Sequence, residues 1–165
     1  MFQNPDHPQR KTVETAPPGS VLVQDCRGDR TVASTGLILT TRLKVRAVVG
    51  MVSDGCVRDS GTIGKIGLPL FFCADASAPL NLAKHHAVDL NVPIACGSVA
   101  VYPGDIVVGD VDGVVIVPRH LAEEVAKDAT EQELTEEFLS ARVEGGAILR
   151  GTYPPNEDTL ATFKE

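Results

Sequence analysis

The chain has 165 residues, of which 43% are hydrophobic, and it contains 15 glycines, 11 prolines and no tryptophan. This length suits one domain with a sizeable core, and the composition favours short Val, Ile and Leu strands joined by tight turns over a helical bundle. The net charge of -7 argues against a basic nucleic-acid-binding surface.

The first half of the chain predicts short strands around one helix. Residues 1–17 form a polar lead-in, and a Pro-Gly turn then precedes a predicted strand over 20–25. Residues 36–46 end in basic side chains, which suit the carboxyl end of a helix. The run 47–52 is rich in β-branched residues and too short for a free-standing helix, so it predicts a buried central strand. A helical turn over 60–66 and a strand over 70–73 complete this half.

The second half predicts a hairpin and then helices. Residues 74–96 read as irregular. In residues 103–118 (PGDIVVGDVDGVVIVP), Asp112-Gly113 separates two apolar runs, which predicts a β-hairpin. Residues 119–143 have the periodicity of an exposed amphipathic helix, and a short helix over 158–163 is expected to pack on a neighbour. The acidic run of the long helix reads as a solvated face: Glu131, Glu133, Glu136 and Glu137.

An adjacent Arg58-Asp59 pair follows the predicted central strand. Polar residues just beyond a buried strand are where α/β proteins place chemistry. A guanidinium fork can bind a carboxylate or a carbonyl oxygen, and a carboxylate can hold a hard divalent cation. From spacing alone, the simpler interpretation is a solvated turn, because charged residues are mostly exposed.

Three blocks of the sequence resemble the RraA-like family: VVGMVSDGCVRD, IGLPLF and PGDIVVGDVDGVVIVP followed by a helix. This family contains class II pyruvate aldolases acting on 4-hydroxy-4-methyl-2-oxoglutarate and 4-carboxy-4-hydroxy-2-oxoadipate, and also regulators of ribonuclease E activity. The resemblance covers about residues 17–145 and starts near the family's middle strand, so we expect the N-terminal part of longer members to be lacking.

The resemblance implies a single compact α/β domain over 1–165, with mixed sheets of the swivelling β/β/α type. Residues 119–165 would be its C-terminal helical segment. It also implies assembly into homotrimers or hexamers, with active sites between subunits.

The resemblance also implies a site and a chemistry. The family's loop maps onto Gly36, Leu37, Ile38 and Leu39, whose backbone N–H groups would bind a substrate carboxylate at a helix N-terminus. Arg58 would bind the 2-keto oxygen and stabilise an enolate. Asp59 would be the direct protein ligand of Mg²⁺ or Mn²⁺, a Lewis acid for cleavage of a 2-oxo acid to pyruvate or for oxaloacetate decarboxylation. An acid of a neighbouring subunit could complete the metal shell, with Glu131, Glu133 and Glu136 as open choices.

Leu37 departs from the family pattern, because the enzymes carry an aspartate at this position that orients metal-bound water and moves protons. Leucine can do neither, so the lyase would be impaired. Two hypotheses follow: a metal-dependent lyase, favoured by the intact Arg58-Asp59 pair, and a non-catalytic regulator that binds and inhibits a ribonuclease. Leu37, the shortened front and the acidic exterior favour the second hypothesis. The acidic exterior suits a basic partner.

The remaining candidates carry weaker signals. Four cysteines are scattered without CxxC spacing and read as reduced, mostly buried thiols: Cys26, Cys56, Cys73 and Cys96. Together with the lack of a membrane-length apolar stretch and of a secretory signal, they predict a cytoplasmic protein. His85-His86 reads as a surface or interface element rather than a metal site, His120 as structural, and Asp110 and Asp112 as turn residues.

Overall fold

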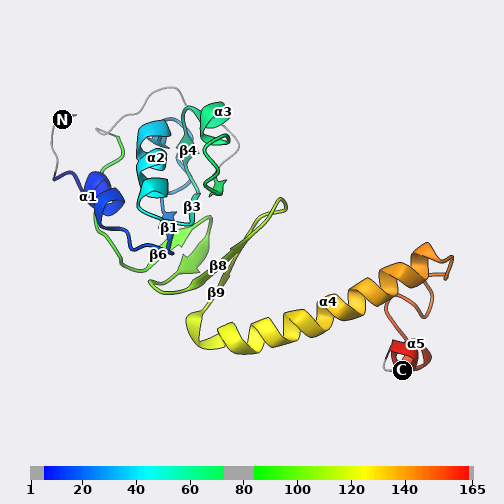
Figure 1. Ribbon diagram of the computed structural model, residues 1–165. Coiled ribbons are helices and arrows are strands. Elements are labelled where there is room, and N and C mark those ends of the chain that lie inside the picture. The colour runs from blue at the N-terminus through cyan, green and yellow to red at the C-terminus, as the bar shows by residue number, and fades with distance from the viewer. Residues whose placement is uncertain (1–5, 73–83, 164–165) are drawn as a thin grey trace. The chain divides into compact units, whose positions relative to one another are not determined.

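The computed structural model describes residues 6–72 and 84–163, which form a mixed α/β structure with parallel and antiparallel sheets (Figure 1). The chain divides into two compact units, Met1–Pro118 and Arg119–Glu165. All of the described strands belong to the first unit, and the second unit is helical.

A parallel sheet with the order β1-β3-β5 lies in the first unit. Its strands are β1 (Val21–Gln24), β3 (Gly50–Ser53) and β5 (Leu70–Phe71). All three agree with predicted strands, but the central one begins later than expected. Ala47 has a left-handed backbone with a φ of 59°, and the N–H of Val48 bonds the carbonyl of Leu43 at 3.1 Å. Residues 47–49 therefore form the turn that enters β3, and Cys73, expected in the last strand, lies outside the described residues.

A second parallel pair consists of β2 (Ala33–Thr35) and β4 (Cys56–Val57). Each strand leads directly into a helix: β2 into α2 (Leu37–Val45) and β4 into α3 (Ser60–Ile63). Both helices were predicted, α3 being shorter than the expected turn over 60–66. Because the two strands run parallel, the starts of both helices come to the same end of the pair.

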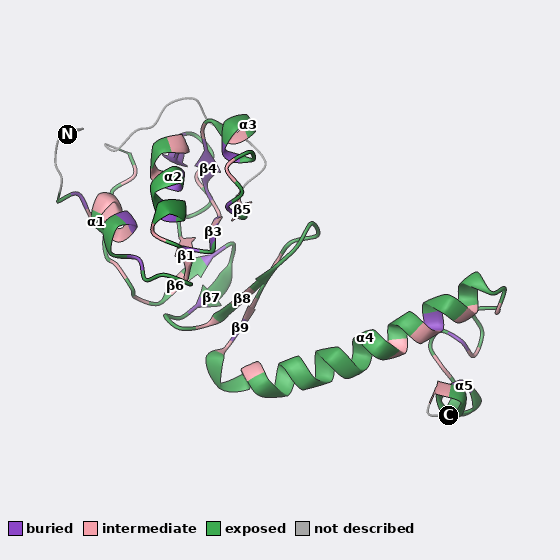
Figure 2. Cartoon of the chain, viewed as in Figure 1, coloured by how far each residue is buried: buried purple, intermediate pink, exposed green. Residues whose placement is uncertain are grey.

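The core of the first unit lies between helices and the β1-β3-β5 sheet. Its buried members come from α1 (Pro8–Thr15), α2, β3 and the connecting turns: Val13, Ala16, Leu43, Val48, Met51 and Leu68 (Figure 2). The helix α1 corrects the interpretation of residues 1–17 as a polar lead-in without an element. The sequence of α1 lacks a clear apolar period, because only Val13 is buried within the helix.

An ion pair holds α1 to α2 beside this core. The Arg42 guanidinium donates to both carboxylate oxygens of Glu14, from Nε at 3.0 and 3.1 Å and from Nη2 at 2.7 Å. These hydrogen bonds lower the pKa of Glu14 from its ordinary value. The contact explains why a mostly polar helix packs in a defined place.

Two antiparallel hairpins complete the first unit. One joins β6 (Ile94–Cys96) to β7 (Val99–Val101), so residues 94–96 are not irregular as expected. The other joins β8 (Ile106–Gly109) to β9 (Val114–Val117) and confirms the predicted hairpin. Oδ1 of Asp110 accepts the N–H groups of Asp112 and Gly113 at 2.8 and 3.2 Å, which confirms the turn role of this acid.

The second unit consists of η1 (Arg119–Leu121), α4 (Ala122–Glu144) and α5 (Glu157–Phe163). Both predicted helices are confirmed, and the acidic run of α4 is exposed as expected (Figure 2). The rings of Phe138 and Phe163 lie 5.3 Å apart, which packs α5 on the last turns of α4. None of the helices in the described ranges is long and apolar enough to cross a membrane.

Candidate active site

The predicted site residues meet at the carboxyl ends of β2 and β4. Thr35 of β2 is in register with Val57 of β4, and the N–H of Arg58 donates to the carbonyl of Thr35 at 3.1 Å. The chain then turns into α2 from Gly36 and into α3 from Asp59. The pairing thus brings together two segments that are 22 residues apart in the sequence.

Asp59 contacts the first turn of α2 directly. Its Oδ2 accepts the backbone N–H of Leu37 at 3.1 Å. A carboxylate here is favourable because the first N–H groups of a helix lack intrahelical acceptors and carry partial positive charge. The first N–H groups that follow, those of Ile38 and Leu39, also have no acceptor within the helix.

The backbone of Asp59 is left-handed, with φ of 62° and ψ of 24°. Such a conformation is uncommon for a residue with a side chain, although aspartate tolerates it better than most. Residues held in this way concentrate at functional sites. Here the turn directs the Asp59 carboxylate toward α2 while the carbonyl of Asp59 accepts the N–H groups of Thr62 and Ile63 at 2.9 Å.

Gly36 lies against both members of the Arg-Asp pair. A Cβ built on Gly36 would lie 3.0 Å from Cγ and Nε of Arg58 and 3.1 Å from Oδ2 of Asp59. These separations are shorter than ordinary carbon contacts. The φ of Gly36 is -156°, extended backbone that any residue adopts, so close approach is what requires glycine here.

The Arg58 guanidinium has an unused hydrogen-bond donor. Its Nε is shielded from solvent and has no hydrogen-bond partner among the described residues. The same atom lies 3.7 Å from Oδ2 of Asp59, beyond hydrogen-bond distance, while the side chain as a whole is 43% exposed. A shielded donor without a partner is costly unless a ligand satisfies it, so Arg58 is suited to receive an oxygen atom.

The donors at this site fit a hydrated divalent cation. The Asp59 side chain is 44% exposed, and in the described part of the chain its Oδ1 has no hydrogen-bond partner. Mg²⁺ commonly takes one or two carboxylates and completes its shell with water and substrate. The described residues contain no cluster of three or more His, Cys, Asp or Glu arranged for a metal, so Asp59 would be a single protein ligand within this unit. Glu131, Glu133 and Glu136 belong to the second unit.

The side chains of the α2 loop differ in burial. Leu39 packs against the core cluster, whereas Ile38 is 79% exposed. Leu37 is half-buried and contributes only its backbone N–H to the described contacts.

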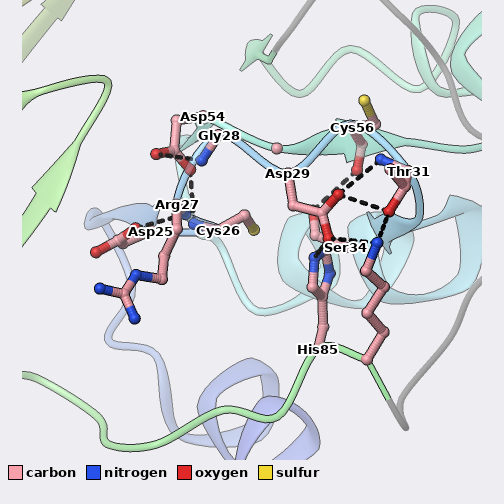
Figure 3. Close-up of polar contacts among 12 residues, drawn as sticks. Asp25, Cys26, Arg27, Gly28, Asp29, Thr31, Ser34, Asp54, Cys56 and His85 are labelled. Carbon is pink, nitrogen blue, oxygen red and sulfur yellow. Dashed lines mark hydrogen bonds and ion pairs between the residues drawn. The ribbon is translucent and has the colours of Figure 1, made fainter.

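A second polar cluster, which the sequence analysis did not identify, surrounds Asp29. Its Oδ1 accepts the N–H and the hydroxyl of Thr31 at 2.8 and 2.6 Å (Figure 3). Its Oδ2 lies 3.3 Å from Nζ of Lys84 and 3.2 Å from Nε2 of His85. These contacts, Thr31 foremost, hold the pKa of Asp29 well below its usual range. His85 therefore has a structural partner in Asp29, and no pattern in the sequence indicated this contact because His85 lies 56 residues along the chain from Asp29.

The described cysteines are free and buried: Cys26, Cys56 and Cys96. Burial raises the pKa of Cys26 and raises that of Cys96 to about 11. A nucleophilic cysteine needs a depressed pKa and access, so these two thiols are structural. Cys73 lies outside the described residues.

Comparison with known proteins identifies the family of this chain. The RraA-like family model, described as Aldolase/RraA, matches residues 1–116. A Halalkalibacterium halodurans protein, provisionally named as a 4-hydroxy-4-methyl-2-oxoglutarate aldolase, is 35% identical over 143 residues, covering 87% of this chain and 67% of the relative. An uncharacterised Methanocaldococcus jannaschii protein is 36% identical over 118 residues, covering 70% of this chain but only 54% of its own length.

One of the similar solved structures is named as a member of a ribonuclease-inhibitor family. Streptomyces coelicolor RraAS2, described as an unusual member of the RNase ES inhibitor RraA protein family, matches with a TM-score of 0.68 and 32% identity. The match covers 82% of this chain and 69% of that one. The similar proteins therefore include both an aldolase name and a ribonuclease-inhibitor name.

Proposed function

The chain belongs to the RraA-like family, and from this premise we propose that it is a divalent-metal-dependent lyase of the pyruvate-aldolase type. Its substrates would be 2-oxo acids like 4-hydroxy-4-methyl-2-oxoglutarate, cleaved to pyruvate, with oxaloacetate decarboxylation as a related activity. The observation that carries the proposal is the meeting of Arg58, Asp59 and the first turn of α2 at the ends of β2 and β4.

Each residue has a role that its contacts support. The N–H groups of Ile38 and Leu39 have no acceptor within α2, so they suit a substrate carboxylate at the helix N-terminus. Arg58 would hold the 2-keto oxygen, since its Nε lacks a partner among the described residues. Its positive charge would stabilise the negative charge that this oxygen gains as the C–C bond breaks.

Asp59 would hold Mg²⁺ or Mn²⁺ through its exposed carboxylate. When bound, such an ion supplies Lewis-acid polarisation of the 2-oxo acid. The Leu37 N–H and the Arg58 guanidinium both face Oδ2 of Asp59, at 3.1 and 3.7 Å, which leaves Oδ1 to face a metal ion.

Leu37 limits the rate of the proposed reaction. An apolar side chain stands where the family's enzymes carry an acid, so this position can neither orient water nor move a proton. We infer a slow enzyme whose binding groups are complete and whose proton transfer depends on water or on another subunit.

The active form is proposed to be a homotrimer or hexamer. The β8–β9 hairpin supports assembly, because it exposes Ile106, Val108 and Val115 by 43%, 57% and 62%. Two-stranded hairpins are marginal alone, and unpaired strand edges favour pairing with another chain. An acid of a neighbouring copy could then complete the metal shell.

A non-catalytic regulator of a ribonuclease is the second candidate. One observation favours it: α4 carries eight acidic and two basic side chains on a helix in which only Leu139 is buried. An exposed acidic helix suits a basic protein partner.

A pyruvate-release assay separates the two functions. The full-length chain is incubated with 4-hydroxy-4-methyl-2-oxoglutarate, and separately with oxaloacetate, with Mg²⁺ or with excess chelator. The lyase predicts metal-dependent pyruvate formation that is lost in Asp59→Ala. The regulator function would be supported instead if no metal-dependent turnover is seen and if both the unsubstituted chain and Asp59→Ala bind and inhibit a ribonuclease.

A further inference from the structure

An open cavity of about 440 Å³ lies in the first unit where β1 and β3 end. Its lining comes from the loop after β1, the end of β3 and the β6–β7 hairpin: Arg27, Gly28, Arg30, Asp54, Ala95, Gly97 and Ser98. Ligands of α/β proteins bind outside the carboxyl ends of parallel strands. The cavity thus occupies a position that such sheets use for binding.

Two tight turns form the walls of this cavity. In the first, the N–H of Asp29 bonds the carbonyl of Cys26 at 3.1 Å, and the central residues Arg27 and Gly28 have φ of 56° and 65°. In the second, Gly97 and Ser98 join β6 to β7 with φ of 59° and 67°. Positive φ at both central residues is typical of type I′ turns, which are compact and well defined.

Asp54 fixes the two turns to the end of β3. Its Oδ1 accepts the N–H of Cys26 at 2.6 Å, and its Oδ2 accepts the N–H of Gly28 at 3.1 Å (Figure 3). The same Oδ2 accepts the N–H of Gly97 at 3.3 Å. Three N–H donors partly offset the charge of this carboxylate. The lining is therefore preorganised, and the one acid within it is already engaged by the backbone.

Two guanidinium groups line the same cavity. Arg27 is exposed and forms no ion pair within the described ranges, and Asp25 bonds its backbone N–H at 2.7 Å. Figure 3 shows the Arg27 side chain extending away from the Asp54 carboxylate. Arg30 lines the cavity with it, and the Ser98 hydroxyl adds a neutral donor. Guanidinium forks match the geometry of carboxylate and phosphate oxygens.

We propose that this cavity binds a small oxyanionic ligand, a phosphate group or a dicarboxylate, through Arg27 and Arg30. The cavity is distinct from the candidate active site, because neither Arg58 nor Asp59, which follow β4, lines it. The chain thus offers an anion site in addition to its candidate active site.

Isothermal titration calorimetry of the full-length chain at fixed ionic strength tests the proposal. Inorganic phosphate and malonate are titrated separately in an Arg58→Gln background, which removes the other guanidinium site. We expect saturable binding of at least one anion, weakened at least about tenfold by either Arg27→Gln or Arg30→Gln. The matched control Arg150→Gln removes an exposed charge from the second unit and should leave the affinity unchanged. Preference for phosphate identifies a phosphoryl ligand, and preference for malonate identifies a dicarboxylate.

NMR provides a readout that needs no cavity variant. In the unsubstituted chain, the titrated anion should shift the amide signals of Gly28, Gly97 and Ser98 with one saturation curve. The proposal is overturned if neither anion binds, or if binding persists undiminished in the Arg27→Gln/Arg30→Gln protein. Absence of lyase activity would not affect anion binding in the cavity. The proposed anion site and the proposed lyase function can therefore be refuted independently.

Discussion

The backbone N–H of Leu37 donates a hydrogen bond to Oδ2 of Asp59 at 3.1 Å. This contact joins the start of α2 to the turn after β4, two segments that the parallel β2–β4 pair brings to one end. It places the apolar Leu37 directly beside the proposed metal-binding acid. The chemistry available to the site therefore depends on what residue 37 carries as much as on Asp59.

Replacing Leu37 by aspartate should increase pyruvate release. A carboxylate at this position could orient water and move a proton, a contribution of about 10²–10⁴-fold in rate. The measurement is the metal-dependent kcat for 4-hydroxy-4-methyl-2-oxoglutarate. Ile38→Asp is the control, because it adds the same charge one residue later on a side chain that is 79% exposed. Equal rates for the two variants would contradict the assignment of residue 37.

Asp59→Asn and Asp59→Ala should separate the structural and metal-binding roles of this acid. Asparagine tolerates the left-handed backbone at φ of 62° and can still accept the Leu37 N–H, so Asp59→Asn should keep nearly the full thermal stability. Asp59→Ala loses this hydrogen bond and should cost about 0.5–2 kcal/mol, as the loss of a helix cap does. Both variants should lose Mg²⁺ binding measured by calorimetry. Retained metal affinity in either variant would rule out Asp59 as the ligand.

Gly36→Ala should disturb the site through close contact. Its Cβ would lie 3.0 Å from Nε of Arg58 and 3.1 Å from Oδ2 of Asp59, so both side chains must move. Because the Arg58 and Asp59 side chains are 43% and 44% exposed and can shift, we expect a loss of less than about 1 kcal/mol in unfolding free energy, together with weaker pyruvate binding. Gly61→Ala is the matched control, because a Cβ on this glycine of α3 meets nothing within 4 Å. It should be neutral or slightly stabilising, and a similar loss in both variants would argue against the steric mechanism.

Leu43→Ala should destabilise the first unit by about 2–5 kcal/mol, the range for truncating a buried leucine. Leu43 has 0% exposure and contacts the core formed by α1, α2 and β3. Urea unfolding followed by circular dichroism measures the change. Val45→Ala, on the same helix but 69% exposed, should change the free energy by less than about 0.5 kcal/mol. A small effect of Leu43→Ala would contradict the position of the core.

Asp29→Asn should reduce stability in a pH-dependent way. The Thr31 donors and Lys84 hold the pKa of the Asp29 carboxyl below its ordinary value of 3.8 in the folded chain. The stabilisation is therefore fully present above pH about 4 and is lost as the pH falls toward the lower folded-state pKa. The difference in melting temperature between the natural chain and Asp29→Asn should narrow from pH 7 to pH 3. Asp128→Asn, an exposed acid on α4, should show no such narrowing.

The sequence by itself determined several of the local elements and the family to which the chain belongs. Apolar runs and turn residues predicted β1, β8 and β9, and a helical period predicted α4, because these signals involve neighbours along the chain. The block VSDGCVRD carried the family resemblance, and the family model and relatives confirm that membership. The roles of Arg58 and Asp59 stay predictions.

Only the tertiary structure decided which distant groups meet. Pairing of β2 with β4 sets Leu37 against Asp59 and leaves Nε of Arg58 shielded without a partner in the described part of the chain. The helix α1 was missed because its packing depends on Val13 and on the Arg42–Glu14 contact rather than on a strong apolar period. Likewise, Asp54 meets the N–H of Gly28 across 26 residues of sequence, and Asp29, besides its local contact with Thr31, meets His85 across 56 residues. Local patterns encode secondary structure, whereas such contacts arise only when the strands pair and their ends come together.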